Sequence, residues 1–254
     1  MWKTGALLIL LVATASMAQN SKLAPVPAAA SGWQWIGGRS AAGATNAVTA
    51  SMNTQPANVI LAASAISGAA QSLMDNVGIP WQSINSQQGP LGYPTQRILM
   101  SPVPALTAVF HVFSAVVPSQ FPAIVIGAFH AENPVLIQQG GMMNNVLANT
   151  MSIGPQQPIQ ISTPGAIVIS VYSGESGGYG AAVPEGYTPV ADEPSGGFSV
   201  RMAYKIITAS TATENPVWHI GFVGTMLTAN IVLRADVITP PVEGHAVVIG
   251  GGIL

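Results

Sequence analysis

The sequence predicts an all-β protein, built as a single antiparallel β-sandwich of about ten or more short strands. Apolar and polar residues alternate with a period of two in many segments, which is typical of half-buried strands. Gly, Pro, Ser and Asn separate these segments, as tight connections require. Long helical patterns are missing, and the best helical candidate is the short stretch 66–77. These three observations favour an antiparallel sandwich over alternating βαβ units.

The clearest alternation lies in residues 199–207, where Met202 and Tyr204 share one face and Lys205 lies on the other. We therefore expect Met202 to face the core, and we expect a charge reversal at Lys205 to be tolerated. The other strand candidates are 46–50, 57–66, 80–84, 95–100, 106–113, 122–129, 158–162, 165–173, 216–222 and 226–236.

The ends of the chain differ in composition from this central region. Residues 1–18 read as a signal peptide or N-terminal hydrophobic segment, because a positive charge precedes an apolar run and small residues precede Gln19. The run is too short for a stable membrane span after processing. We expect a linker at 19–32, the sandwich domain at 33–236 and a Pro-broken apolar tail at 237–254. The leader predicts a secreted, extracellular or periplasmic protein; its retention would favour a virion protein.

Charge is scarce in this chain. Only 6% of residues are charged and the net charge is −2, whereas a nucleic-acid-binding domain needs a basic footprint. Nucleic acid is therefore excluded as a partner. The weak charge repulsion suits packing against another protein, including copies of this chain. Without cysteine, the chain has neither disulfides nor thiol chemistry.

Residues 174–178, GESGG, match the G-x-S-x-G pattern around a hydrolase nucleophile. That nucleophile needs a strand before it and a helix after it. A strand candidate precedes Ser176, but the Gly and Pro residues after Tyr179 prevent a helix. Asp192 and His219 complete a Ser–Asp–His order, yet His219 lies within a strand candidate. The pattern favours a loop serine, and a serine hydrolase using Ser176 is the weakest functional alternative.

Metal and cofactor motifs are missing. His130 and Glu132 supply two ligands, which do not make a site, and the acidic pair Asp192–Glu193 fits a turn. The sequence contains no Walker loop, no dinucleotide fingerprint and no recognisable pair of catalytic carboxylates. We therefore predict no catalytic residues, no metal site and no cofactor. The four histidines, none at ligand spacing, are His111, His130, His219 and His245.

Aromatic residues are the remaining candidates for ligand binding. Flat amphipathic rings in loops can stack on sugars or on partner surfaces. The alternative is that each ring folds back to cap an end of the sandwich. The aromatic residues in Gly- or Pro-rich segments are Trp33, Tyr93, Tyr179 and Tyr187. The tryptophans expected in the core are Trp35, Trp81 and Trp218.

The order of short segments resembles a known type of module. The segments run from NAVTASMNTQPANVILAASAIS through GIPWQSI, FPAIVIGAFH and GFSVRMAYKII to TANIVLRAD. This order resembles a jelly-roll or concanavalin-like β-sandwich module of secreted bacterial proteins and phage particle proteins, over about residues 34–236. The resemblance implies a binding or structural role without shared catalytic residues. The modules carry an Asp-rich loop where this chain has LMDNVGIPW, so a loop-bound ion is not implied here.

We therefore expect a non-enzymatic secreted structural or binding module at a cell or particle surface. A phage virion component, such as a decoration or tail-appendage protein, is the alternative. The expected partners are a second copy of the chain, a surface glycan or another structural protein. Residues 245–254 are apolar and β-prone, and they follow the last charge at Glu243. They are expected to cover their own sandwich or to add a strand to a neighbouring copy.

Overall fold

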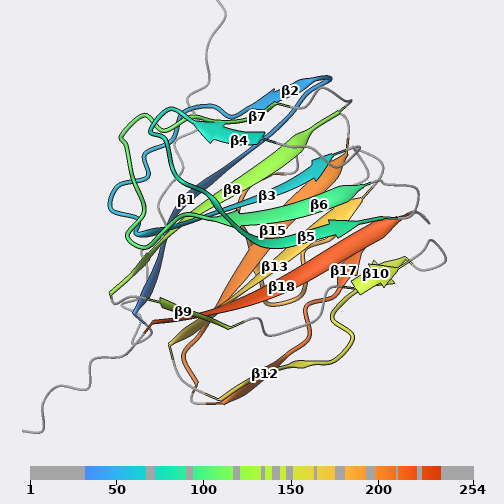
Figure 1. Ribbon diagram of the computed structural model, residues 1–254. Helices are drawn as coiled ribbons and strands as arrows, with labels where there is room; N and C mark the ends of the chain where they lie inside the picture. The colour runs from blue at the N-terminus through green and yellow to red at the C-terminus, as the bar shows by residue number, and fades with distance from the viewer. Residues whose placement is uncertain are drawn as a thin grey trace, which may run out of the picture.

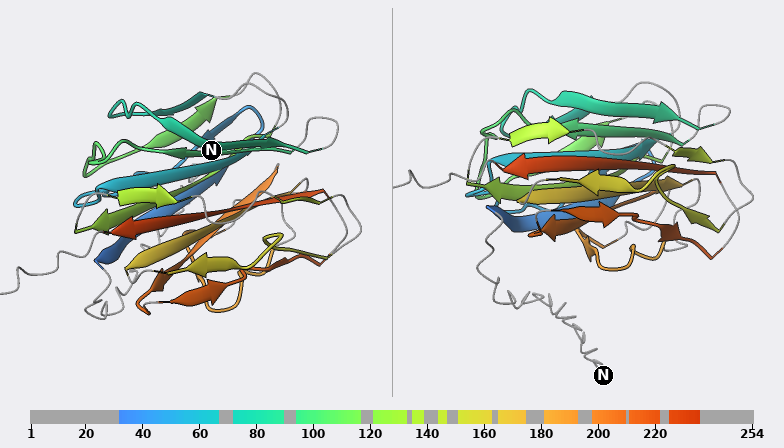
Figure 2. Two further views of the ribbon diagram at one scale, coloured as in Figure 1. Left: turned by 60° about the horizontal axis from the view of Figure 1, so that its bottom comes forward. Right: turned by 90° about the horizontal axis from the view of Figure 1, so that it is seen from below.

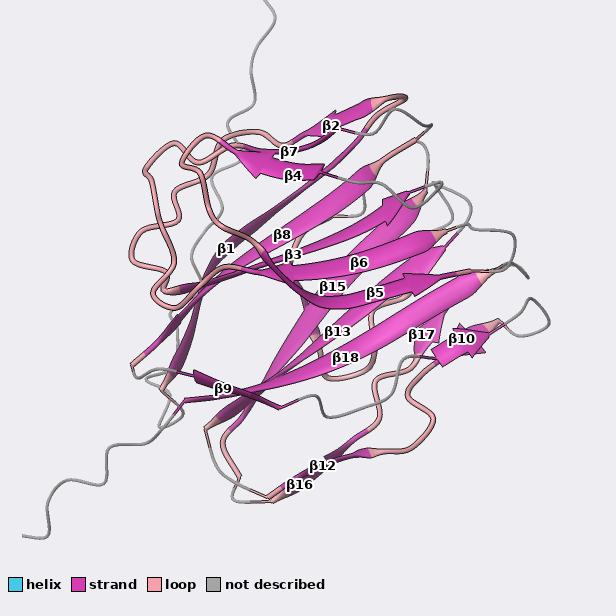
Figure 3. Ribbon diagram, in the orientation of Figure 1, coloured by secondary structure: helices cyan, strands magenta, loops and turns pink. Residues whose placement is uncertain are grey.

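The structure is a computed structural model in which all regular elements of the described residues are strands (Figure 3). No membrane-spanning helix is found among these residues. The described residues are 32–66, 72–89, 94–116, 121–132, 135–138, 144–146, 151–162, 165–174, 181–192, 198–209, 211–221 and 225–235.

The described part of the chain forms eighteen strands, and every strand pair is antiparallel (Figure 1). This confirms the all-β class. The stretch 66–77, the best helical candidate, instead contains the end of one strand and the whole of another. The strands are β1 (Trp33–Ala42), β2 (Asn46–Val48), β3 (Val59–Ile66), β4 (Ser72–Asp75), β5 (Gln82–Gln88), β6 (Thr95–Met100), β7 (Phe113–Val116), β8 (Ala123–Ala131), β9 (Val135–Gln138), β10 (Asn144–Val146), β11 (Ser152–Ile153), β12 (Ile159–Ile161), β13 (Ala166–Gly174), β14 (Thr188–Pro189), β15 (Ser199–Ile207), β16 (Ala212–Glu214), β17 (Trp218–His219) and β18 (Met226–Ala235).

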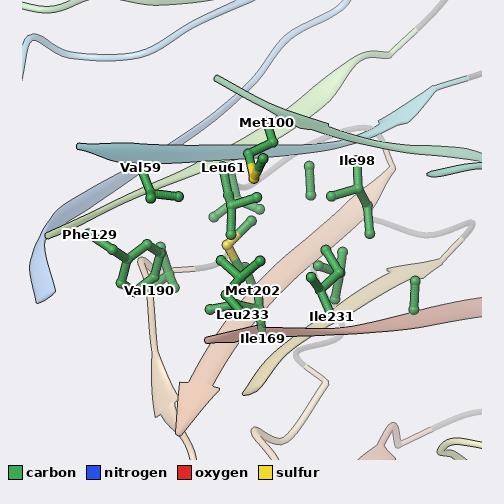
Figure 4. Packing of buried hydrophobic residues seen from close by; sticks show 14 of the residues in the cluster. Val59, Leu61, Ile98, Met100, Phe129, Ile169, Val190, Met202, Ile231 and Leu233 are labelled. Atoms are coloured by element: carbon green, nitrogen blue, oxygen red, sulfur yellow. The ribbon is translucent and has the colours of Figure 1, made fainter. Parts of the chain in front are cut away.

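Two main sheets lie one above the other (Figure 2). The first has the order β1-β8-β3-β6-β5, and the second has the order β10-β18-β13-β15-β14, with β9 also paired to β18. Their facing side chains form one apolar cluster, in which Leu61 and Ile98 of the first sheet accompany Met202 and Ile231 of the second (Figure 4). Met202 is 1% exposed, as its alternation predicts. Two antiparallel sheets with a shared core are consistent with a β-sandwich.

Smaller sheets cover the outer faces of both main sheets. The three-stranded sheet β2-β7-β4 packs through Ala47 and Phe113 onto the outer residues of β3 and β8. The two-stranded sheets β11-β17 and β12-β16 pack through Ile159 and Trp218 onto β13 and β18. The central strands are therefore buried on both faces, and β3 and β13 contain only buried residues. This double burial explains their continuous apolar sequences.

The two main sheets are built alike. The first takes its strands from residues 33–131 and the second from residues 135–235. The strands of each main sheet can be numbered along the chain, with β9 and β10 counted as one edge position because both pair with β18. Both sheets then follow the same order: first, fifth, second, fourth, third. A jelly-roll, in which successive strands alternate between the two sheets, has a different order.

The hydrogen-bonding register repeats as well. Ala63 of β3 pairs with Val125 and Ile98. Ile169 of β13 lies 106 residues later and pairs with Ile231 and Tyr204, each also 106 residues later. The strand order and the register of the three central strands therefore repeat between the two halves, whereas the pairings of the edge strands differ in register. This repeat is not visible in the sequence, because the equivalent positions carry different apolar residues.

Candidate interaction surface

The turn after β4 is organised by the carboxylate of Asp75. Its Oδ1 accepts hydrogen bonds from the backbone N–H groups of Val77 (2.9 Å) and Gly78 (2.7 Å), and its Oδ2 accepts one from Ile79 (3.1 Å). Trp81 Nε1 donates to the same Oδ2 at 3.1 Å. Gly78 has a φ of +82°, which favours glycine at this position of the turn. One carboxylate thereby fixes the whole connection between β4 and β5.

His111 joins this turn to the segment before β3. Its Nε2 lies 3.2 Å from Asp75 Oδ1, and its Nδ1 lies 3.0 Å from Thr54 Oγ1. Thr54 Oγ1 in turn accepts the backbone N–H of Ala108 at 2.9 Å. The imidazole stacks on Phe113 with a centroid distance of 4.1 Å. Thr54 and His111 are both 0% exposed, so the group holds the loop in place and offers no hydroxyl to a substrate.

Burial lowers the pKa of His111 from its ordinary value, and the neighbouring Asp75 carboxylate opposes that shift only in part. The pKa of Asp75 is itself lowered: the hydrogen bonds from the backbone of residues 77–79 and from His111 outweigh the opposing effect of burial. A neutral His111 that donates a hydrogen bond from its Nε2–H to Asp75 has its Nδ1 available to accept one from the Thr54 hydroxyl, which also lies 3.2 Å from the Ala108 carbonyl. Both shifts disfavour the protonated forms of these groups in the folded state.

Stability is expected to fall as the pH drops below about 6.5, the ordinary pKa of histidine. In that range the unfolded chain binds a proton at His111 and the folded chain does not, so the free energy of unfolding decreases by at most about 1.4 kcal/mol per pH unit. Urea unfolding at about pH 8 and about pH 5.5 measures the effect. The difference should shrink in His111→Gln and persist in the control His219→Gln, whose side chain is exposed. Equal pH dependence in native and His111→Gln protein would contradict this assignment.

The outer face of β2-β7-β4 carries exposed apolar side chains. Val48 of β2 and Met74 of β4 lie on either side of Ser114 of β7 in one cross-strand row. Val48 is 51% exposed and Met74 is 50% exposed. Val116 shares this face by strand alternation. Phe110 lies in the turn shortly before β7, next to this sheet, and is 74% exposed. We call Val48, Met74, Phe110 and Val116 the apolar face.

Asn76 holds Phe110 in position. Its Nδ2 donates to the Phe110 carbonyl at 2.9 Å, and its Oδ1 accepts the Val112 N–H at 2.9 Å. With His111 anchored to Thr54 and Asp75, the backbone on both sides of Phe110 is fixed. The ring is therefore presented by a preorganised loop, in which Leu106 and Val109 are also exposed.

The cover of the second half is built around a different polar group, Glu214. Lys205 Nζ lies 2.8 Å from its Oε1, and the Tyr187 hydroxyl donates to its Oε2 at 3.2 Å. Burial and the adjacent carboxylate raise the pKa of Tyr187. Lys205 lies on the face opposite Met202, as expected, but its contact with Glu214 corrects the expectation that Lys205→Asp is tolerated. That change would place two carboxylates together at a site where the Glu214 side chain is 9% exposed.

The structure corrects the placement of two aromatic candidates. Trp33 is the first residue of β1, is 2% exposed, and donates its Nε1 proton to the Gly165 carbonyl. Tyr187 is 9% exposed and packs in the second cover. Neither offers a ring face to a ligand, because apolar packing and a buried hydrogen bond already occupy both rings. Tyr93, Tyr179 and Ser176 lie outside the described residues.

Of the three tryptophans expected in the core, one is fully buried and two are half-buried. Trp218 is fully buried, and its Nε1 donates to Ser170 at 2.9 Å. Trp35 and Trp81 are half-buried; Trp35 stacks on Tyr204 with a centroid distance of 5.9 Å.

The described residues contain no group of three metal-ligating side chains. An open depression of about 360 Å³ lies on β12-β16. It has no aromatic ring on which a sugar could stack. Its lining residues are Gln160, Ile161, Ser162, Thr211, Ala212 and Thr213.

The residues that sequence reasoning missed are Val48, Met74, Phe110 and Val116. Only Val48 lies in a segment whose alternation gave a signal, the strand candidate 46–50; Met74 lies in the stretch considered helical, Val116 lies beyond the candidate 106–113, and Phe110 lies in a turn. No known protein family matches this chain, and searches of curated proteins and of solved structures also find no significant match.

Proposed function

We propose that the protein is a non-enzymatic structural or binding module that attaches to a cell or particle surface through protein–protein contact. The observation that carries this proposal is the apolar face, in which Phe110 is the most exposed side chain. A soluble protein seldom leaves a cluster of large apolar side chains in water unless a partner covers it. The two-sheet core, which we propose is a β-sandwich like those of secreted bacterial and phage particle proteins, supplies a rigid support for that face.

The electrostatics support the same role. The chain has only seven basic and nine acidic residues, so charge steering contributes little to its encounters. Apolar burial is then the main source of affinity for a partner. The absence of an aromatic ring at the depression on β12-β16 favours a protein partner over a surface glycan.

Fractionation of cells that produce the protein, followed by N-terminal sequencing, tests this function. We expect the protein to sediment with the cell surface and to begin at Gln19, because residues 1–18 read as a cleaved leader. Sedimentation within particles with a retained Met1 would favour the virion alternative. A protein found only in the unattached soluble fraction would contradict both forms of the proposal.

A further inference from the structure

We propose that the apolar face is the interface of a homodimer, in which two copies of this chain meet face to face across a two-fold axis. This inference rests on the proposed function, since it names the partner at the same surface. It follows from the charge on the face, from the difference between the two covers, and from the rigidity of the Phe110 loop.

The charge distribution permits a face to pack against its own copy. A two-fold interface places each patch against itself, so any charge near its centre would meet a like charge. The side chain of Asp75, the charged residue of β4, is 1% exposed and is turned toward His111 beneath the face. The described outward residues of β2, β4 and β7, all uncharged, are Asn46, Val48, Met74, Ser114 and Val116.

The two covers lie at opposite ends of the stack, with β2-β7-β4 at the top and β12 at the bottom (Figure 1). Among the described residues of the second half, Met151 is the one exposed large apolar side chain. The second cover otherwise exposes polar groups such as Gln160 and Thr213, which hydrogen-bond to each other at 2.9 Å. A head-to-tail arrangement would bury this polar end against the apolar face.

The difference between the apolar first cover and the polar second cover favours a two-fold dimer over a head-to-tail arrangement. Head-to-tail packing would move the polar groups of the second cover from water onto an apolar surface that offers them no hydrogen bonds, which costs free energy, and it would continue into open chains of molecules. Packing of the apolar face on itself leaves both polar ends in water and closes after two copies. The repeated unit therefore gives one end suited to association and one end suited to solvent.

Phe110 is the expected centre of the binding energy. Interfaces depend on a few large side chains, and aromatic residues held in a fixed conformation lose little entropy on binding. The hydrogen bonds that Asn76 donates to the Phe110 carbonyl and accepts from the Val112 N–H fix the Phe110 backbone before any partner arrives. Met74 of β4 lies two residues before Asn76 and is itself exposed.

Light scattering coupled to size exclusion, over about 1 to 100 µM protein, tests the dimer. The full chain is expected to have twice the mass of one chain. The double variant Met74→Ser, Phe110→Ser is expected to weaken the dimer at least about 100-fold, because two central contacts are lost. The control Met151→Ser removes a side chain that is 59% exposed at the other end of the molecule, and it should remain a dimer.

Other occupants of the face give different results. A full-length protein that is monomeric at the highest concentration overturns the dimer, and so does a mass that keeps growing with concentration. Truncation after Glu243 should leave the dimer intact; a dimer lost on truncation would assign the contact to residues 245–254 instead. Circular dichroism of each variant should keep the β spectrum, so that dissociation is not caused by unfolding.

The dimer and the proposed function fail separately. A monomer that still sediments with the cell surface or with particles overturns the dimer and leaves the function standing. A dimer that never sediments supports the dimer and contradicts the function.

Discussion

Met202→Asp is expected to abolish folding. Met202 lies 1% exposed in the cluster between the two main sheets, where its neighbours include Leu61 and Ile169 (Figure 4). The side chains that pack with it in that cluster are apolar, so a carboxylate at this position would be moved from water into an apolar environment. An unpaired buried charge costs several kcal/mol, comparable to the roughly 5–15 kcal/mol that holds a whole domain folded. Circular dichroism and solubility of the purified variant measure the result.

Met202→Leu is the matched control. It keeps nearly the same volume and apolar character, so it should fold and lose less than about 1.5 kcal/mol of unfolding free energy. A folded Met202→Asp protein with a normal β spectrum would show that the two sheets do not enclose this side chain.

Replacing Asp75 with alanine is expected to lower the free energy of unfolding by about 3–5 kcal/mol. The carboxylate accepts hydrogen bonds from three backbone N–H groups, from Trp81 Nε1 and from His111 Nε2. Without it, the part-buried donors of Val77, Ile79 and Trp81 lose their partner, and an unsatisfied buried donor costs about 1–3 kcal/mol. Urea unfolding at neutral pH measures the loss.

Asp192→Ala is the control for Asp75→Ala, since Asp192 is exposed and its contact to Ser40 is made through the backbone carbonyl. It should change the unfolding free energy by no more than about 0.5 kcal/mol. Similar losses in the two variants would mean that the hydrogen bonds to Asp75 contribute nothing beyond those of a surface carboxylate.

The strand content of this fold was predictable, because alternation reports which side chains face a core. It placed Met202 inward and Lys205 on the opposite face, and the structure confirms both. The pairing of the strands was not predictable. Ala63 pairs with Val125 and Ile98 only after long connections, and the sequence offers many apolar strands that could take the same place. The repeat was hidden for the same reason: burial on both faces selects apolar character rather than particular residues.

The candidate surface was only partly accessible to sequence reasoning. The aromatic residues of Gly- and Pro-rich segments were expected at the surface, but such segments also lead directly into buried strands, as Trp33 and Tyr187 show. Asp75 and His111 are 36 residues apart, and their contact depends on β4 pairing with β7. A local motif search has no means of finding such a pair. Leu106 and Phe110 lie in the strand candidate 106–113, yet both are exposed, because β7 begins only at Phe113.

The repeated unit also bears on how a single chain assembles. The two halves dock through their inner faces, and only residues 133 and 134 separate β8 and its following turn from β9. Such a short tether holds the second half near the first at an effective concentration on the order of millimolar. Docking within one molecule should then outcompete an exchange of halves between molecules, the domain swapping to which duplicated proteins are prone. Because the two halves belong to one chain, their docking does not depend on the concentration of the protein.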